Sequence, residues 1–222
     1  MHNLKSITRN IVATITLHEA TPGHHMQDAI LSSSQILPRF VTQFVDLPGD
    51  LPSSIPSYMY VAYKEGWGLY SEYLGYDLGI YQNEPMKELG YIKGDLLRSA
   101  RLVVDVGLHK YGWTREKAIE FLIDNTGFSK GDFTLKTCEK PSSLSNPFYY
   151  VAEVAEAQID RYISLPGQAV AYKIGEREIQ RLRKKYTQEM GLSLQKFHTY
   201  VLKCIGPLGD LESCILGFIH HQ

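Results

Sequence analysis

The chain has 222 residues, with 23 lysines and arginines against 24 aspartates and glutamates, so its formal charge is −1. This balance argues against a nucleic-acid-binding groove and a polybasic membrane anchor, because both need surplus basic side chains. The longest apolar stretches fall far short of the roughly 20 residues that span a bilayer. The three cysteines, Cys138, Cys204 and Cys214, form no C-x-x-C pair, so we expect neither a disulfide framework nor a cysteine zinc site.

The spacing of apolar residues predicts a series of helices and no strand. The first helix covers residues 5–20 and resumes over residues 24–31. A bulge at Pro22 and Gly23 interrupts it, because proline lacks a backbone hydrogen-bond donor and glycine resists helical order. Further helices are expected, in chain order, over residues 58–81, 85–109, 114–123, 151–164, 168–186 and 194–204, the last being the final helix of the chain. The fold class is therefore predicted to be mainly α.

The helix predicted over residues 58–81 contains Gly66, Gly68 and Gly75. Each glycine weakens a helix by about 1 kcal/mol relative to alanine. We therefore expect these glycines to allow close packing against a neighbouring helix, which compensates for the loss.

The helix predicted over residues 85–109 carries an apolar stripe, and we expect this stripe to be core. The stripe includes Leu89, Ile92, Leu96, Leu97, Ala100, Val103 and Val104. Residues 129–150 are polar, contain proline and lack periodicity, which predicts an insertion or loop within a single domain.

The strongest chemical signal lies in the segment H-E-A-T-P-G-H-H, residues 18–25. A zinc peptidase needs two neutral imidazoles as ligands and a carboxylate that can take a proton from the attacking water. In the standard H-E-x-x-H motif the two histidines share one helix face at i and i+4, but Pro22 occupies position i+4 here. Looping two or three residues out of the helix would return His24, or less easily His25, to the side of His18. Histidines that cap helices or lie on the surface are the alternative.

A later helix offers a third ligand. Glu65 and Glu72 are seven residues apart, so both can face the same neighbouring element. Zinc sites on helical folds take their third ligand from such a glutamate, and the two features together favour a metal site over a chance pairing of histidines.

Four ordered segments together resemble one family. They are H-E-A-T-P-G-H-H-M-Q (18–27), E-G-W-G-L-Y-S-E (65–72), R-L-V-V-D-V-G-L-H (101–109) and D-R-Y-I-S-L-P-G-Q-A-V-A-Y-K-I-G (160–175). They are similar to the family catalogued as domain of unknown function 885, whose members are largely helical, usually much longer than this chain, and similar to zinc metallopeptidases of the glutamate-zincin type. The resemblance implies that residues 1–222 form one partial metallopeptidase-like domain, the C-terminal portion of a larger helical domain.

The resemblance also implies a metal site. It assigns one zinc ion to His18, His24 and Glu65, with His25 as the alternative to His24. Glu19 would be the general base that takes a proton from water. Glu72 would accept a hydrogen bond from a ligand imidazole, or would be a solvated charge on the helix surface.

Four further residues are candidates for roles in substrate binding or turnover. His109 or Tyr172 would donate a hydrogen bond to the oxyanion; the alternatives are a partner of a helix dipole for His109 and a packed core residue for Tyr172. Arg161 and Lys173 would bind a peptide carboxylate, and the alternative for each is a surface ion pair.

The function expected from the sequence is that of a zinc-dependent hydrolase, a peptidase that acts on a peptide or another small amide. Two alternatives remain: a zinc-binding protein without catalytic activity, and a helical interaction module whose histidines are structural. The chain shows no secretory signal, and secretion is expected only if its start is truncated.

Overall fold

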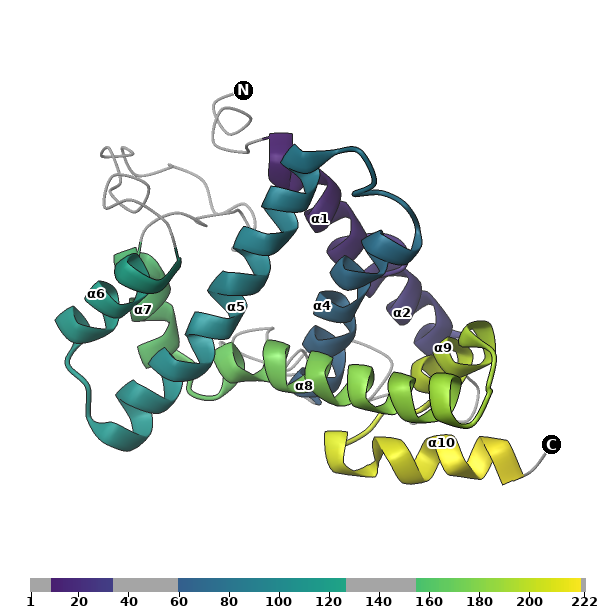
Figure 1. The fold of residues 1–222 in the computed structure, drawn as a ribbon. Helices are drawn as coiled ribbons and strands as arrows, with labels where there is room; N and C mark the ends of the chain where they lie inside the picture. Colours follow the sequence, from purple (N-terminus) through teal and green to yellow (C-terminus); the bar gives the residue numbers. More distant parts are fainter. Residues whose placement is uncertain (1–8, 34–59, 127–154, 221–222) are drawn as a thin grey trace. The chain divides into compact units, whose positions relative to one another are not determined.

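We describe the protein from a computed structural model, over residues 9–33, 60–126 and 155–220. The helices are α1 (Arg9–Glu19), α2 (His24–Ser32), α4 (Val61–Asp77), α5 (Pro85–Tyr111), α6 (Arg115–Thr126), α7 (Ala155–Ser164), α8 (Gln168–Arg183), α9 (Leu194–Lys203) and α10 (Leu211–His220), as Figure 1 shows. No strand occurs in these ranges, and the predicted mainly α fold is confirmed. The predicted insertion at 129–150 and Cys138 lie outside the described residues.

The chain divides into two compact units. The first combines residues 1–92 with residues 171–222, and the second is residues 93–170. Helices α5 and α8 each contain a boundary between the two units.

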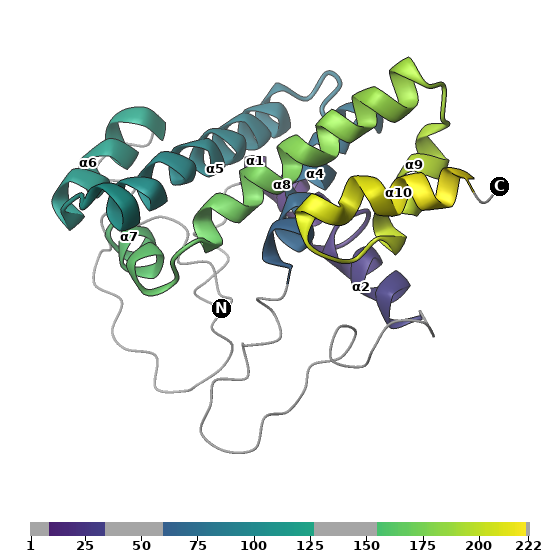
Figure 2. The same ribbon diagram turned by 90° about the horizontal axis from the view of Figure 1, so that it is seen from below.

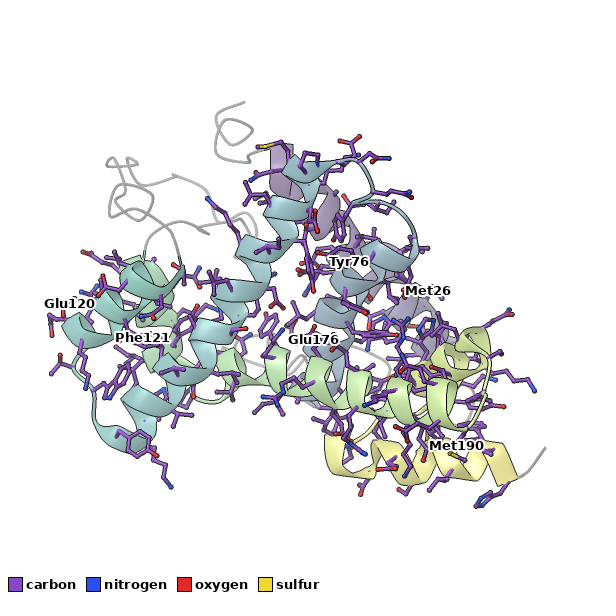
Figure 3. The ribbon with its side chains drawn as sticks, in the orientation of Figure 1. Met26, Tyr76, Glu120, Phe121, Glu176 and Met190 are labelled. Carbon is purple, nitrogen blue, oxygen red and sulfur yellow. A yellow bond between two sulfur atoms is a disulfide. The ribbon has the colours of Figure 1, made fainter. Side chains whose placement is uncertain are left out.

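In the first unit, α4 lies against α1 and α2, and α2 also packs on α9 (Figures 1 and 2). The side chains of Tyr63, Trp67 and Tyr70 on α4 are at most 1% exposed. They form a core with apolar residues of the later helices, which include Ile179, Leu182, Phe197, Val201, Leu211 and Ile215. Met26 of α2 packs against the edge of this core (Figure 3).

Gly66 permits the close contact with a neighbouring helix that the sequence predicts, whereas a Cβ atom on Gly75 would meet the ring of Tyr81, just after α4. A Cβ atom on Gly66 would lie 2.5 Å from the Cα of Gly175 on α8, and one on Gly175 would lie 1.8 Å from the backbone oxygen of Ala62. Real Cβ contacts do not come this close, so α4 and α8 can cross here only because both positions lack a side chain.

In the second unit, the C-terminal part of α5 packs with α6 and α7. Its core includes Ala100, Val104, Leu122, Ile159 and Tyr162. At its edge, the guanidinium of Arg101 donates to the Tyr162 hydroxyl (2.6 Å) and to Oε1 of Gln158 (3.1 Å).

The prediction that the whole apolar stripe of α5 is core is wrong. Ala100 and Val104 are buried, but the side chains of Leu89, Ile92, Leu96 and Val103 are 39%, 49%, 41% and 43% exposed. The apolar residues of α5 cover a wider arc than the face that joins the core with α6 and α7.

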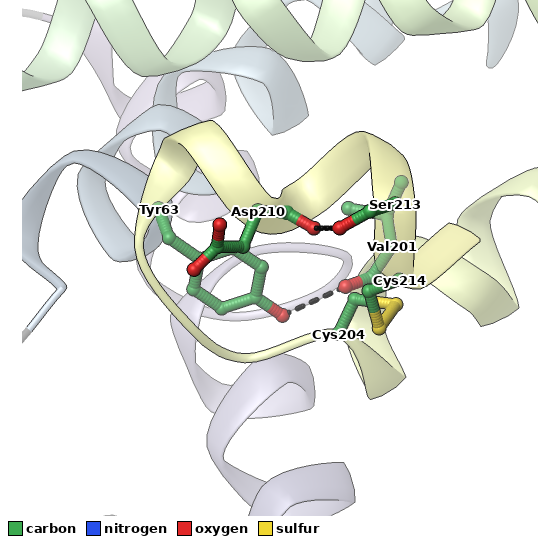
Figure 4. Close-up of a disulfide and its surroundings, with 6 residues drawn as sticks. All are labelled: Tyr63, Val201, Cys204, Asp210, Ser213 and Cys214. Atoms are coloured by element: carbon green, nitrogen blue, oxygen red, sulfur yellow. Dashed lines mark hydrogen bonds between the residues drawn. A yellow bond between two sulfur atoms is a disulfide. The ribbon is translucent and has the colours of Figure 1, made fainter. Parts of the chain in front are cut away.

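Two predictions for the C-terminal region are also wrong. A further helix, α10, follows α9 after a 3₁₀ turn (Leu208–Asp210). Cys204 at the end of α9 forms a disulfide with Cys214 on α10 (Figure 4). The disulfide was not expected because pairing depends on α10 folding back beside α9, which spacing alone does not specify.

Removing this disulfide should destabilise the first unit. The crosslink closes a short loop between residues 10 apart, for which chain entropy predicts a loss of about 2–3 kcal/mol in the free energy of unfolding. Thermal unfolding of the double variant Cys204→Ala, Cys214→Ala measures this. Ser213→Ala, an exposed change on the same helix, is the matched control and should change the free energy by less than about 0.5 kcal/mol. If adding a reducing agent left the melting temperature of the wild type unchanged, the stabilising role of the disulfide would be refuted.

Candidate metal centre

The segment between α1 and α2 brings two histidines together. α1 ends at Glu19 and α2 begins at His24, so the chain breaks into two helices where the sequence predicts a bulge within one. Gly23 lets the connecting segment pass close to the end of α1, because a Cβ atom there would lie 1.8 Å from the backbone oxygen of His18. As a result, the His18 and His24 rings meet edge to face with their centroids 4.8 Å apart.

Helix α4 places Glu65 against both histidines. Its Oε2 atom lies 3.5 Å from Nε2 of His18 and 3.3 Å from Nε2 of His24. In the described part of the chain, these three residues form the group of potential metal ligands whose atoms all lie within 4.8 Å of one another. Two nitrogens thus converge on a single carboxylate oxygen.

The outer nitrogen of each imidazole also has a partner. Nδ1 of His18 lies 2.7 Å from Oε1 of Glu72, a residue that is fully buried. Nδ1 of His24 lies 3.2 Å from Oε1 of Gln27. Carboxylate and amide oxygens accept hydrogen bonds, so each Nδ1 donates and each Nε2 is turned towards Glu65.

The turn itself is held from α4. The indole Nε1 of Trp67 donates a hydrogen bond to the backbone oxygen of Pro22 (2.8 Å). The interaction fixes the turn against the helix that carries Glu65, and it therefore helps to set the distance between Glu65 and the two histidines.

Gly68 brings the backbone of α4 up to the two rings. A Cβ atom on Gly68 would lie 2.7 Å from Nε2 of His18 and 3.0 Å from Cε1 of His24. The site therefore requires glycine at position 68, just as the crossing of α4 and α8 requires glycine at position 66.

Ionisation of the site follows from the same contacts. Burial opposes the charge on Glu65, but its hydrogen bonds with His18 and His24 outweigh burial and hold the pKa of Glu65 well below its ordinary value. Burial likewise lowers the pKa of His24, but the bond and charge of Glu65 raise it by more, so the net pKa is above 6.5. Without a cation, His24 and Glu65 form an ion pair.

Tyr172 of α8 also reaches the site. Its ring stacks on that of His18, with centroids 6.2 Å apart and planes inclined by 23°. The other predicted residue of this helix, Lys173, places Nζ 2.6 Å from Oε2 of Glu176, a buried carboxylate labelled in Figure 3.

The remaining predicted residues lie outside the histidine–glutamate group. Glu19 is the last residue of α1 and is exposed, and His25 is exposed on α2. His109 and Arg161 belong to the second unit. There, Nε2 of His109 lies 2.8 Å from the backbone oxygen of Tyr162, to which it can donate, and Arg161 donates to Gln168 (3.1 Å).

Sequence reasoning missed three residues that shape the site: Gln27, Trp67 as a hydrogen-bond donor, and Gly68 as a contact of the imidazoles. The position of Gln27, three residues after His24 on a helix, is a local signal that could have identified it. The contact between Trp67 and Pro22 joins segments 45 residues apart and has no such signal.

Comparison with known proteins gives the family. The family described as bacterial protein of unknown function (DUF885) matches residues 1–137 and 148–210. The chain belongs to this family. No curated protein is significantly similar in sequence.

Two solved structures share the fold of this DUF885 chain. One, called a "putative lipoprotein", is from Colwellia psychrerythraea and is 33% identical over the whole chain, with a TM-score of 0.77. The other, a "putative lipoprotein of unknown function" from Shewanella oneidensis, is 23% identical over 96% of the chain, with a TM-score of 0.69. The chain spans about a third of each, 32% and 33% of their respective lengths.

None of the helices in the described ranges is both long enough and apolar enough to cross a membrane.

Placing a methyl group at position 68 should destabilise the protein. In an ordinary helix Gly→Ala stabilises by about 1 kcal/mol, but at Gly68 the new Cβ would collide with His18, and overpacking costs about 1–3 kcal/mol. Urea unfolding of Gly68→Ala measures the sign. Gly217→Ala on α10 is the matched control, since no atom lies within 4 Å of its Cβ position, and it should stabilise. Stabilisation by both changes would refute the close contact.

The ion pair between His24 and Glu65 should make the stability of the metal-free protein depend on pH. The depressed pKa of Glu65 contributes stability above its ordinary value of 4.5, and this is lost as pH falls through the lower folded value. The raised pKa of His24 contributes stability below 6.5, and this is lost as pH rises through the higher folded value. The pair therefore stabilises most between these two ordinary values, about pH 4.5 to pH 6.5. The free energy of unfolding of wild type minus that of Glu65→Gln, measured across pH, should peak in this window; a flat difference would contradict the ion pair.

Proposed function

We propose that this chain carries the metal centre of a zinc-dependent peptidase. The observation that carries the proposal is the convergence of two imidazole Nε2 atoms on one carboxylate oxygen, at 3.3 and 3.5 Å. Zinc binds nitrogen and oxygen ligands at about 2.0–2.1 Å in a tetrahedron, whose edges are then about 3.3–3.4 Å long. The two separations are close to the length of this edge.

The chemistry of the ligand set supports zinc as well. His18 and His24 both direct Nδ1 to an acceptor and turn Nε2 towards Glu65, where each Nε2 could bind a cation once His24 has lost its second proton. When bound, zinc would act as a Lewis acid and lower the pKa of a coordinated water to about 7. If His18, His24 and Glu65 held zinc, they would leave one position for water or substrate, as the protein ligands of catalytic zinc sites do.

The proposed mechanism uses residues that surround the ligands. Glu19, next to His18 in the chain, takes a proton from the attacking water and later delivers it to the leaving amine. The hydroxyl of Tyr172 donates a hydrogen bond to the substrate carbonyl oxygen as negative charge develops there; the stacking of its ring on His18 supports this role. Lys173, on the same helix as Tyr172, is a candidate for binding the carboxylate of a peptide.

A second candidate function is metal binding without turnover. It is favoured by one observation: the chain spans about a third of the length of its two structural relatives. In that case, the residues that bind the substrate would belong to the other two thirds of the family's polypeptide.

Glu19→Gln separates these two functions. The variant should bind zinc as the wild type does, because Glu19 is not a ligand, and it should lose about 10²–10⁴-fold in turnover, because the amide cannot accept the proton. The measurements are zinc content by elemental analysis and cleavage of a peptide library. Equal cleavage by Glu19→Gln and wild type would refute the mechanism, and stoichiometric zinc with no cleavage by the wild type would favour the second candidate.

Two further variants serve as controls for the ligand set. His18→Ala should lose the metal, whereas His25→Ala should retain one zinc ion per chain, because His25 is exposed and lies outside the ligand group. Retention of zinc by His18→Ala would remove the basis of the proposed function.

A further inference from the structure

Exposed apolar side chains are concentrated on α5. In the described part of the chain, half of the exposed large apolar side chains lie on this one helix, and they are Met86, Leu89, Ile92, Leu96, Val103, Val106 and Tyr111. Single exposed apolar side chains are normal on a protein surface, whereas a contiguous group of them marks an interaction surface.

Most of these side chains form a stripe with the spacing of a coiled coil. The α5 stripe consists of Leu89, Ile92, Leu96, Ser99, Val103 and Val106. Successive members are three or four residues apart, as the a and d positions of a heptad are. Because α5 is an uninterrupted helix of 27 residues, the stripe is about 26 Å long at 1.5 Å per residue. A surface of this shape fits another helix.

Two copies of the α5 stripe match each other when they run antiparallel. A two-fold axis between positions 96 and 99 places Leu89 opposite Val106 of a second copy, and Ile92 opposite Val103. It also places Leu96 opposite Ser99, where the small serine leaves room for the larger side chain and lets the helices approach closely. Every a position then meets a d position, as knobs-into-holes packing requires.

The charges at the two ends of α5 favour the same direction. The first turn contains Glu88, and the last turn contains His109 and Lys110. The lysine near the acidic end, Lys87, is already paired with Glu84 (3.3 Å). An antiparallel pair therefore brings Glu88 beside the basic end of the other helix, whereas a parallel pair would bring like charges together, which costs free energy.

We propose that a second copy of this chain covers the α5 stripe, so that the protein is a two-fold symmetric dimer with antiparallel α5 helices. The same surface then serves both copies, and the assembly closes at two chains. The stripe shares no residue with the histidine–glutamate group, so this inference is independent of the proposed function.

The self-complementarity of the stripe is the reason for choosing a second copy as its occupant. The alternative occupant is a segment of the family's polypeptide outside these 222 residues, since the chain spans about a third of its two structural relatives. A surface that binds such a segment has no need to match its own reverse in apolar positions and in charge.

The first test is the mass in solution, measured by light scattering after size-exclusion chromatography. The wild type should have twice the mass of one chain, which is 25.2 kDa. Ile92→Glu should weaken association by at least about 100-fold, because each dimer would bury two carboxylates against apolar side chains. Ile92 is 49% exposed in the single chain, so this change leaves the fold intact, and Leu78→Glu is the matched control at an exposed position outside the stripe. It should remain a dimer.

The second test uses disulfide crosslinking to read the direction of the helices. In a Cys138→Ser background, whose two other cysteines pair with each other, the double variant Ile92→Cys, Val103→Cys should form a covalent dimer on oxidation. Positions 92 and 103 lie about 16 Å apart along one helix, too far to pair within a chain. Ile92→Cys alone is the control: it should stay uncrosslinked in an antiparallel pair, and it would crosslink in a parallel one.

Three outcomes would overturn the proposal. A monomeric wild type would do so, and it would leave the α5 stripe to a segment of the family's polypeptide outside residues 1–222. A dimer that persists in Ile92→Glu would place the interface elsewhere, and crosslinking by Ile92→Cys alone would exclude the antiparallel direction. Failure of the wild type to bind zinc, with the dimer intact, would contradict the proposed function alone.

Discussion

Oε2 of Glu65 lies within 3.5 Å of the Nε2 atoms of both His18 and His24, and this three-atom contact determines how closely α1, α2 and α4 must approach one another. A carboxylate that is mostly withdrawn from water, as that of Glu65 is, needs positive charge or hydrogen-bond donors beside it. The two imidazoles satisfy Glu65, and Glu72 and Gln27 satisfy the imidazoles in turn. The polar contacts of the site thus extend beyond His18, His24 and Glu65 to Glu72 on α4 and Gln27 on α2.

The close approach of these helices requires glycine at specific positions, and glycine lowers the stability of a helix. Glycine weakens a helix interior by about 1 kcal/mol, yet α4 has Gly66 where α8 crosses and Gly68 where the imidazoles lie. Gly23 serves the same purpose in the turn, because no side chain fits beside the backbone oxygen of His18. These three glycines are thus explained by the distance between backbones, and the helices gain their stability from the aromatic core around Tyr63, Trp67 and Tyr70.

Local features of the sequence predicted much of this site. The interruption at Pro22-Gly23 and the seven-residue spacing of Glu65 and Glu72 are visible within single segments, and helical geometry converts each into a position in space. The choice between His24 and His25 could not be made in the same way, because it depends on the residue at which α2 begins. In the structure α2 begins at His24, whose ring joins His18 and Glu65.

Features that depend on distant segments were not predictable. The Cys204–Cys214 disulfide needs α10 to return beside α9, and the exposed stripe of α5 depends on which face α6 and α7 cover. Apolar periodicity identifies a helix and the breadth of its apolar face, but it does not say how much of that face a neighbour will bury.

The most direct test of the metal centre is an anomalous difference map at the zinc absorption edge, from a crystal of this protein grown with zinc. We expect one strong peak between His18, His24 and Glu65, at about 2.0–2.1 Å from Nε2 of each histidine and from the Glu65 carboxylate. A map with no peak at this position, or with zinc bound only to other residues, would contradict the account.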